Sequence, residues 1–179
     1  MRPGKVEAPT LRPPERLAQH HRIDAFRCSH ESLARWLRER AFDGQASGAS
    51  HTFVVCEGDT VVGFYSLAAG SVSHAQAAGA KMRRNMPDPI PVALLGRLAV
   101  HEDHERRGIG SGLLKDASLR CLRAAQEGPG VVAILCHAID DAAKSFYLAH
   151  GFVQSPVEPL TVMLPLRDLA QRLAASMRR

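Results

Sequence analysis

The first half of the chain has the hydrophobic pattern of one helix followed by two strands. Between residues 31 and 40 the apolar positions recur every three or four residues, as on one face of a helix, and Ser29 stands where a cap is expected. The runs 51–56 and 60–67 are rich in β-branched and aromatic residues, and Glu57-Gly58-Asp59 between them is typical of a hairpin. The pattern therefore predicts an antiparallel strand pair after the first helix.

The second half of the chain alternates between the two patterns. Residues 70–91 have neither period, and the proline-rich stretch 86–91 cannot form a helix. The strands and helices predicted after it alternate over residues 92–100, 112–125, 131–137, 140–150, 160–164 and 167–173. The near-continuous apolar run 131–137 is typical of a strand covered on both faces. This order predicts an α/β (α+β) fold with parallel pairing at the centre of its sheet.

Length and composition fit one globular domain. The chain has 179 residues, and its 45% hydrophobic and 23% charged residues exclude global disorder. The prolines within residues 1–16 predict a flexible or extended N-terminal arm, which leaves 17–179 as the domain. The net charge of +5 permits an anionic partner but does not choose among nucleic acid, nucleotide and membrane surface.

The chain lacks the patterns of a membrane or secreted protein. No apolar run approaches the roughly 20 residues needed to span a bilayer, and the N-terminal residues lack the apolar core of a signal peptide. The cysteines form no CxxC pair, and most of them stand in apolar surroundings. They are Cys28, Cys56, Cys121 and Cys136. We therefore expect packed, reduced thiols in a cytoplasmic protein without a membrane partner, rather than a disulfide or zinc framework.

The most specific local feature is a glycine turn between a strand and a helix. Residues 106–111, Arg-Arg-Gly-Ile-Gly-Ser, follow a strand that ends near Val100 and lead directly into the next helix. Glycines let successive backbone N–H groups converge, and the helix N-terminus and two arginines add positive charge, which suits a pyrophosphate. The alternative is a tight turn that binds nothing. The Lys-Ser/Thr of a P-loop and a complete GxGxxG are absent, which excludes ordinary NTPase and dinucleotide sites.

This turn and a later stretch together resemble a known family. The Gly-x-Gly-x-x-Leu-Leu helix entry and the segment from Asp140 to Phe152 are similar to the two signature regions of the GNAT N-acetyltransferases. The resemblance covers residues 92–152, with Glu105 where Gln or Arg is usual and Asp140 where Asn is usual. It implies a GNAT fold, a single mixed, twisted sheet flanked by helices with a splay between its two central parallel strands. It also implies acetyl-CoA as cosubstrate and no metal.

The resemblance also implies roles for individual residues. Tyr147 matches the tyrosine that commonly protonates the departing thiolate, and a phenol with a reference pKa of about 10 is protonated at neutral pH. The alternative for Tyr147 is an aromatic side chain that packs its helix on the sheet. The backbone of the strand ending at Val100 is expected to pair with the pantetheine arm, and the N–H of Val100 to polarise the thioester carbonyl. The residues expected to bind the cofactor are Leu98, Ala99, Val100, Glu105, Arg106, Arg107, Gly108, Ile109, Gly110, Ser111, Asp140 and Ala143.

The acceptor is suggested by a missing carboxylate. Residues 90–100 contain no Asp or Glu, the base that histone-type lysine acetyltransferases place on this strand. An α-amino group, with a reference pKa of about 7.7–8.0, needs little help to become neutral, whereas a lysine at about 10.4 needs much. The missing carboxylate therefore favours an α-amine acceptor. His101, His104 and His137 are candidates for a base acting through water, and each is also typical of a turn or packing residue.

Three further stretches narrow the resemblance to one branch of the family. Residues 22–28, 85–100 and 163–169 are similar to the GNAT toxins of bacterial toxin–antitoxin pairs. That branch acetylates the α-amino group of aminoacyl-tRNA, stops translation, and is held inactive by a ribbon-helix-helix antitoxin. The resemblance implies these two partners and leaves a homodimer open. The alternatives are an acetyltransferase for a small-molecule amine or a protein N-terminus, and a degenerate fold that only binds a partner.

A basic cluster is the candidate RNA contact. Lys81, Arg83 and Arg84 stand close together in the irregular stretch, and Arg97 follows them. Such residues would track a phosphate backbone, with an affinity that falls as salt rises. The alternatives are a solvated loop and a surface that meets an acidic antitoxin segment. Aromatic residues make up only 5% of the chain, so base stacking on an aromatic platform is not expected.

Overall fold

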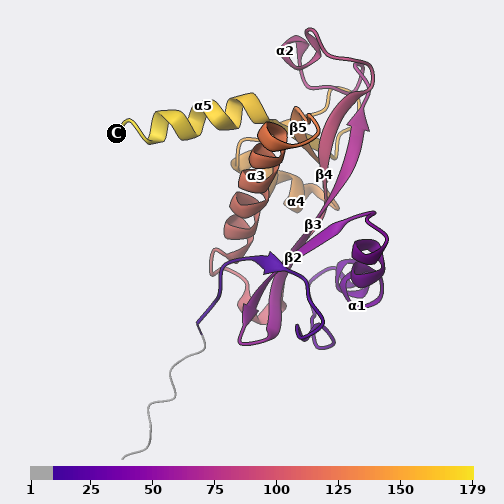
Figure 1. The fold of residues 1–179 in the computed structure, drawn as a ribbon, viewed down its shortest axis with the longest axis vertical. Helices are drawn as coiled ribbons and strands as arrows, with labels where there is room; N and C mark the ends of the chain where they lie inside the picture. Colours follow the sequence, from indigo (N-terminus) through magenta and orange to yellow (C-terminus); the bar gives the residue numbers. More distant parts are fainter. Residues whose placement is uncertain (1–9) are drawn as a thin grey trace, which may run out of the picture.

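A single seven-stranded sheet flanked by helices forms the protein (Figure 1). The structure is a computed structural model, and it describes residues 10–179. The strands lie in the order β1-β2-β3-β4-β5-β7-β6. They are β1 (Glu15–Arg16), β2 (His51–Glu57), β3 (Thr60–Val72), β4 (Ile90–Val100), β5 (Ala133–His137), β6 (Val153–Gln154) and β7 (Thr161–Pro165). The helices are α1 (Glu31–Ala46), α2 (Ala80–Arg83), α3 (Ile109–Glu127), α4 (Asp141–Ala149) and α5 (Leu166–Ser176), with a 3-10 turn at Glu102–His104.

The centre of the sheet contains its one parallel pair among the described strands, β4 and β5. This pair is hydrogen-bonded only where Ala93 faces Ile134 and Leu94 faces Leu135. Beyond Leu94, β4 continues for six residues along β3 with no strand on its other edge. The fold class, the parallel pair and the splay between the central strands are therefore confirmed.

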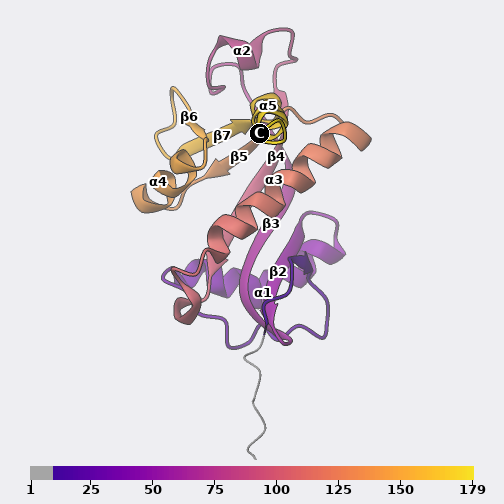
Figure 2. The ribbon, with the colours of Figure 1, turned by 90° about the vertical axis from the view of Figure 1, so that its left-hand side faces the viewer.

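Helices cover both faces of the sheet. Figure 2 shows α3 running across one face, with α1 behind the sheet. The core on the α3 side also includes residues of α4 and α5, whereas the core on the α1 side joins α1 to β2 and β3. Gly63 of β3 lets α3 approach, because a Cβ at Gly63 would lie 3.0 Å from Ile109 Cγ2 and 3.1 Å from Leu113 Cδ1. The N-terminus of α3 is thereby anchored beside the end of β4.

Several element boundaries differ from those predicted. Ser29 does not cap α1, because the N-cap residue is His30, which makes no side-chain capping hydrogen bond. The second strand of the hairpin runs on to Val72, and a short helix, α2, stands within the stretch expected to be irregular. Helix α3 begins at Ile109, three residues earlier than predicted. Ile109, Gly110 and Ser111 therefore form its first turn.

The N-terminal end of the described chain is attached to the sheet, whereas the C-terminal helix extends away from it. Residues 1–9 of the predicted arm lie outside the described residues, while Glu15–Arg16 pair with β2 at the edge of the sheet. The guanidinium of Arg120 donates to the carbonyl of Pro14 at 3.1 Å, which ties this segment to α3. At the other end, α5 extends away from the body of the molecule (Figure 1).

The cysteines are free thiols, as expected from their spacing. Cys56, Cys121 and Cys136 are buried and Cys28 is partly buried. Among the helices of residues 10–179, none has both the length and the apolar character that a membrane crossing requires.

Candidate active site

An anion cradle lies at the N-terminus of α3. Gly108 caps the helix with a left-handed backbone (φ 77°), and Arg106 is also left-handed (φ 62°). The first intrahelical bond of α3 runs from the Gly112 N–H to the Gly108 carbonyl, so the N–H groups of residues 109–111 have no helical partner. The turn over residues 105–108 is exposed. Orphan donors, the helix dipole and two exposed arginines therefore converge where a diphosphate would bind.

The cradle is held in place by contacts on both sides. Ile109 is buried beneath it, and a Cβ at Gly110 would lie within 3.8 Å of Val100 and Phe146 side-chain atoms. Ser111 Oγ lies 3.0 Å from His150 Nε2, which connects the first turn of α3 to the end of α4. Of the sequence-predicted residues, Glu105 to Gly108 and Ser111 are exposed, Gly110 is partly buried and Ile109 anchors the turn in the core.

The free edge of β4 leads to this cradle. Leu98, Ala99 and Val100 pair with Tyr65, Phe64 and Gly63 of β3 on one side. On the other side the described chain places no strand next to them, because β5 separates after Leu94. An extended ligand arm can therefore pair with this edge as an added strand would.

A bulge at Gly96 sets the directions of the side chains that follow it. Ser66 pairs with Arg97 while the next residue, Leu67, pairs with Leu95, so Gly96 is the extra residue of β4. Leu95 and Leu98 both pack in the core beneath α3, whereas Ala99 belongs to the core beneath α1. Arg97 lies on the α1 side, with its guanidinium carbon 4.2 Å from the centre of the Trp36 ring.

Tyr147 lies at the splay, in the core that β4 and β5 share. Its side chain is only 5% exposed and packs against Phe146 and Phe152, each with ring centres 5.3 Å away. Burial, reinforced by the neighbouring Cys136 thiol, raises the pKa of Tyr147 above its ordinary value. Burial also raises the pKa of Cys136, to about 11. Tyr147 therefore keeps its proton at neutral pH and can act as an acid.

Asp140 and Ala143, both predicted to bind the cofactor, are bonded to each other. The N–H of Ala143 donates to Asp140 Oδ1 at 2.8 Å, which caps α4. The other carboxylate oxygen of Asp140 accepts from His30 Nε2, also at 2.8 Å. Both carboxylate oxygens of Asp140 thus have hydrogen-bond partners within the protein. Asp140 therefore caps α4 and holds it to the start of α1.

All three histidines considered as bases have hydrogen-bond partners within the protein. His101 Nδ1 accepts from the Asp103 N–H at 3.2 Å, and His104 Nε2 lies 2.9 Å from Glu57 Oε2. His137 stands at the end of β5, exposed, with Nδ1 2.8 Å from Thr161 Oγ1. Of the three, His137 is the one at the open end of the parallel pair.

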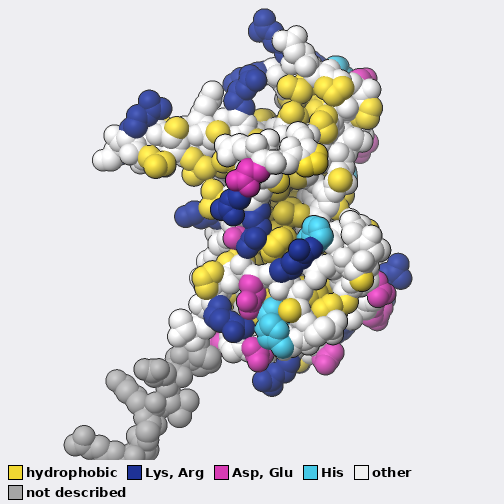
Figure 3. Space-filling model, in the orientation of Figure 1, with side chains coloured by type: hydrophobic (Ala, Val, Ile, Leu, Met, Phe, Trp, Pro, Cys, Tyr) yellow, Lys and Arg dark blue, Asp and Glu magenta, His cyan; other side chains and the backbone are white. Residues whose placement is uncertain are grey.

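The predicted basic residues occupy two places. Lys81, Arg83 and Arg84 line a hollow of about 910 Å³ together with Arg167 of α5. Figure 3 shows Lys and Arg side chains at the end of the molecule that carries α2. Arg97 is not part of this hollow, because it stacks on α1, at the opposite end of the long axis from α2 (Figure 1). The structure therefore separates Arg97 from the cluster.

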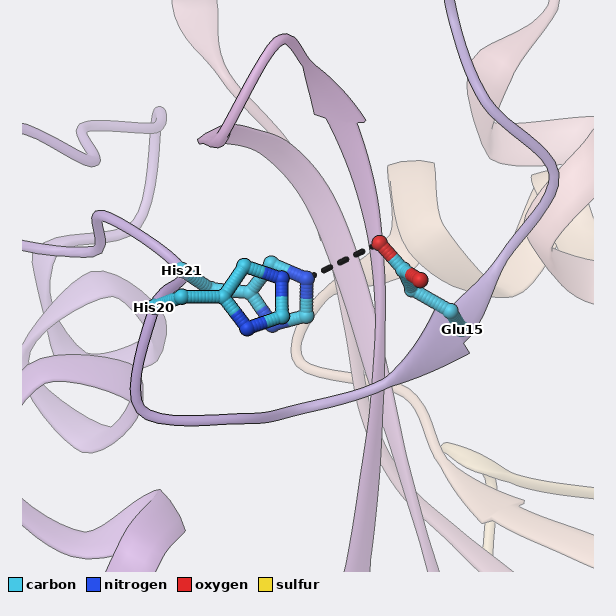
Figure 4. A group of neighbouring side chains, drawn as sticks. All are labelled: Glu15, His20 and His21. Carbon is cyan, nitrogen blue, oxygen red and sulfur yellow. Dashed lines mark hydrogen bonds and ion pairs between the residues drawn. The ribbon is translucent and has the colours of Figure 1, made fainter.

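A group of metal-ligand residue types occurs near the N-terminus. Figure 4 shows Glu15, His20 and His21, whose nearest ligand atoms lie within 4.8 Å of one another. His21 Nδ1 accepts from the Ala18 N–H at 2.9 Å, so Nε2 carries the proton and donates to Glu15 Oε1 at 2.9 Å. Since both ring nitrogens are used, His21 holds a turn together here and offers no lone pair to a metal.

Three residues near the site were not among those predicted from the sequence. They are Trp36, His150 and Arg167. Trp36 had only the signal of a helix core position, and His150 meets Ser111 across 39 residues of chain. Arg167 follows the start of α5 and joins the α2 residues only through the tertiary fold. No local pattern marks such partners.

An open strand edge, a turn of orphan N–H groups at its end and a buried phenol in the adjoining core are the features expected of a coenzyme A-dependent acyltransferase. Residues 48–154 match the family model described as an acetyltransferase (GNAT) domain. The tRNA-acetylating toxin of Mycobacterium tuberculosis is 47% identical over 155 residues, which cover 87% of this chain and 92% of that protein. The chain therefore belongs to the GNAT acetyltransferases, and within them to the family of this toxin.

Solved structures of low sequence identity have the same fold. AtaT complexed with acetyl-methionyl-tRNAfMet has a TM-score of 0.85 at 20% identity, covering 92% of this chain and 99% of that chain. A tyrosine-to-phenylalanine mutant of KacT has a TM-score of 0.84 at 22% identity, covering 90% and 98%. AtaTR bound with acetyl-CoA has a TM-score of 0.79 at 20% identity, covering 91% and 98%.

Proposed function

We propose that this protein is a toxin N-acetyltransferase that moves the acetyl group of acetyl-CoA to the α-amino group of aminoacyl-tRNA and thereby blocks translation. The observation that carries the proposal is the 47% identity to a tRNA-acetylating toxin, and the buried phenol of Tyr147 supports it. The structurally similar AtaT has been solved in complex with acetyl-methionyl-tRNAfMet, which is the expected kind of product.

The cofactor is held mainly by backbone groups. The N–H groups of residues 109–111 and the side chains of Arg106 and Arg107 bind the diphosphate, while the pantetheine arm pairs with β4 from Leu98 to Val100. The N–H of Val100 polarises the thioester carbonyl. Of the other predicted cofactor residues, Asp140 and Ala143 contribute by orienting α4, which carries Tyr147.

The reaction forms one C–N bond and breaks one C–S bond. The neutral α-amine attacks the thioester carbon, the C–S bond then breaks, and Tyr147 gives its proton to the departing thiolate of coenzyme A. The ammonium formed on the acceptor loses a proton to water, and the Tyr147 phenolate regains one from water. Of the histidines considered as a base, His137 is exposed at the end of β5 and can relay the acceptor's proton. Because an α-amine has a reference pKa of about 7.7–8.0, a useful fraction is neutral without a carboxylate base.

The RNA contacts are the basic hollow and Arg97. Lys81, Arg83, Arg84 and Arg167 present four cations at the α2 end, of which Lys81 is 3.4 Å from Asp168. These residues would follow the phosphate backbone of the acceptor arm. A surface this basic also suits an acidic segment of an antitoxin.

The partners follow from the same assignment. We propose that a ribbon-helix-helix antitoxin holds the protein inactive, that the toxin works in the cytoplasm where aminoacyl-tRNA is present, and that it forms a homodimer. AtaT has been solved bound to the C-terminus of its antitoxin AtaR. Sedimentation alone and with the antitoxin tests both assemblies.

The decisive experiment is mass spectrometry of total aminoacyl-tRNA after incubation with isotopically labelled acetyl-CoA. We expect label on the α-amine of at least one aminoacyl group, and far slower labelling with the Tyr147→Phe variant. The competing function is acetylation of a small-molecule amine or a protein N-terminus. Label on free amines or peptides but not on aminoacyl-tRNA would establish that function instead.

A further inference from the structure

Arg97 has an unusual environment for a charged side chain. It stands three residues beyond Leu94, the last residue of β4 that pairs with β5. The bulge at Gly96 turns it to the α1 face of the sheet, since an unbroken strand would place it on the same face as Leu95, in the α3 core. The local backbone irregularity thus delivers a cation to the mouth of the splay.

A layered aromatic support holds the guanidinium. Trp36 of α1 stacks on Phe64 of β3 with ring centres 6.2 Å apart and an interplanar angle of 10°. The Arg97 guanidinium carbon lies 4.2 Å from the centre of the Trp36 ring, over its face. Because Phe64 is fully buried, the Trp36 ring has a rigid base, and the planar guanidinium is oriented before any ligand binds.

The N–H edges of this guanidinium lack a protein partner. Across residues 10–179, no carboxylate lies within 4.0 Å of Arg97 and no hydrogen-bond acceptor meets its side chain. Burial lowers the pKa of Arg97 with no acidic neighbour to offset it. By contrast, Arg27, Arg38 and Arg120 each pair with a nearby carboxylate. A partly buried, unpaired cation with five donors is suited to an anion supplied by a ligand.

We propose that Arg97, stacked on Trp36, binds the phosphodiester that joins the last two nucleotides of the aminoacyl-tRNA acceptor. This inference rests on the proposed function. The α-amine must reach the thioester at the splay, so the phosphate nearest the amine arrives beside Arg97. A guanidinium fork binds two phosphate oxygens at once, so the contact orients the aminoacyl ester as well as attracting it. The α2 cluster then serves more distant phosphates.

The test removes the negative charge of the phosphate and the positive charge of Arg97, singly and together. Aminoacyl-tRNA is prepared with either the natural phosphodiester or a neutral methylphosphonate at the last linkage, and kcat/KM is measured for wild type and Arg97→Gln. On the natural RNA, we expect Arg97→Gln to lower kcat/KM by roughly tenfold to a hundredfold. The methylphosphonate should lower the kcat/KM of wild type by a similar factor. It should hardly change the kcat/KM of Arg97→Gln, because both changes remove the same interaction.

Further variants separate orientation from charge. Arg97→Lys retains a cation without the planar fork and should recover only part of the loss, and Trp36→Leu should reduce kcat/KM on the natural RNA alone. Arg123→Gln, on the exposed face of α3, is the matched control and should behave as wild type. Thermal melting and acetyl-CoA titration check that each variant is folded and binds the cofactor.

Each outcome decides the proposal. If the methylphosphonate leaves the kcat/KM of wild type unchanged, or lowers the kcat/KM of wild type and Arg97→Gln equally, Arg97 does not bind this phosphate. The proposed acetylation of tRNA would still stand. If Arg97→Gln loses acetyl-CoA affinity, the anion that Arg97 binds belongs to the cofactor. If wild type acetylates neither RNA, the proposed function fails, and this inference fails with it.

Discussion

Ser111 Oγ lies 3.0 Å from His150 Nε2, and this contact joins the first turn of α3 to the end of α4. His150 Nδ1 lies 2.7 Å from the carbonyl of Phe146, an acceptor only, so Nδ1 carries the proton. In the neutral ring Nε2 therefore accepts from the Ser111 hydroxyl. The cradle for the diphosphate and the helix of Tyr147 are thus connected by one hydrogen bond.

The Ser111–His150 contact predicts coupled effects on cofactor binding. We expect Ser111→Ala and His150→Ala each to weaken acetyl-CoA binding several-fold, because each removes the support between the two helices. The double variant should bind no more weakly than the worse single variant, as groups that act as a pair do. Isothermal titration of the four proteins measures this, and fully additive losses would mean that the two residues act independently.

Tyr147→Phe should separate chemistry from binding. The change removes only the hydroxyl from a buried ring, so packing and acetyl-CoA affinity should be retained. Turnover on aminoacyl-tRNA should fall by about 10²–10⁴-fold, the usual contribution of a positioned acid. Steady-state rates and calorimetry on the same preparation check both halves. Near-normal turnover of Tyr147→Phe would remove the phenol from the mechanism.

Asp140 should stabilise the protein in a pH-dependent way. The Ala143 N–H chiefly, and His30 as well, lower the pKa of Asp140 below its ordinary value. A lowered native pKa stabilises the fold above the ordinary carboxyl pKa of about 3.9, and this contribution is lost as pH falls through the native value. We expect Asp140→Ala to lower the melting temperature by a few degrees at pH 7, with the difference from wild type shrinking under acid.

Asp140→Asn is the matched variant for that measurement. Asparagine keeps an oxygen for the Ala143 N–H but loses the charge that faces His30, so its melting temperature at pH 7 should lie between those of wild type and Asp140→Ala. A loss equal to that of alanine would show that the contact with His30, rather than the cap, holds α4.

Reversal of the α2 charges should affect RNA and spare the cofactor. The triple change of Lys81, Arg83 and Arg84 to Glu removes three cations from the hollow and adds three anions beside Arg167. We expect tRNA acetylation to be abolished and acetyl-CoA affinity to be unchanged. Rates measured across a salt series should decline more steeply for wild type than for a variant with only one of these residues changed to Gln, which makes one phosphate contact fewer. Unchanged acetylation would assign the cluster to another partner.

Two glycines near the cradle should respond oppositely to alanine. Gly108 has a φ of 77°, so Gly108→Ala should cost about 1–2 kcal/mol of unfolding free energy and weaken acetyl-CoA binding. Gly112 lies inside α3 with open space where a Cβ would stand, so Gly112→Ala should stabilise the fold by up to about 1 kcal/mol. Denaturant unfolding of both variants tests this, and equal effects would contradict it.

The sequence alone predicted those features of this protein that depend on residues close together in the chain. Periodicity predicted five of the seven strands and the four long helices, because each pattern reports which face is buried. The two-residue strands β1 and β6 are too short to show a period and were missed. The glycine turn and the Tyr147 helix also lie in continuous stretches, so their resemblance to a family identified both. The same stretches carried the assignment of acetyl-CoA.

Tertiary structure decided the contacts that join distant segments. The sequence grouped Arg97 with Lys81, Arg83 and Arg84, yet one extra residue at Gly96 turned Arg97 toward Trp36. Asp140 was expected to bind the cofactor, yet His30, 110 residues earlier, occupies one of its oxygens. The face of the sheet on which a side chain lies depends on the strand register. The hydrogen bonds that it can still offer a ligand depend on the groups that the fold brings near it, and local sequence patterns specify neither.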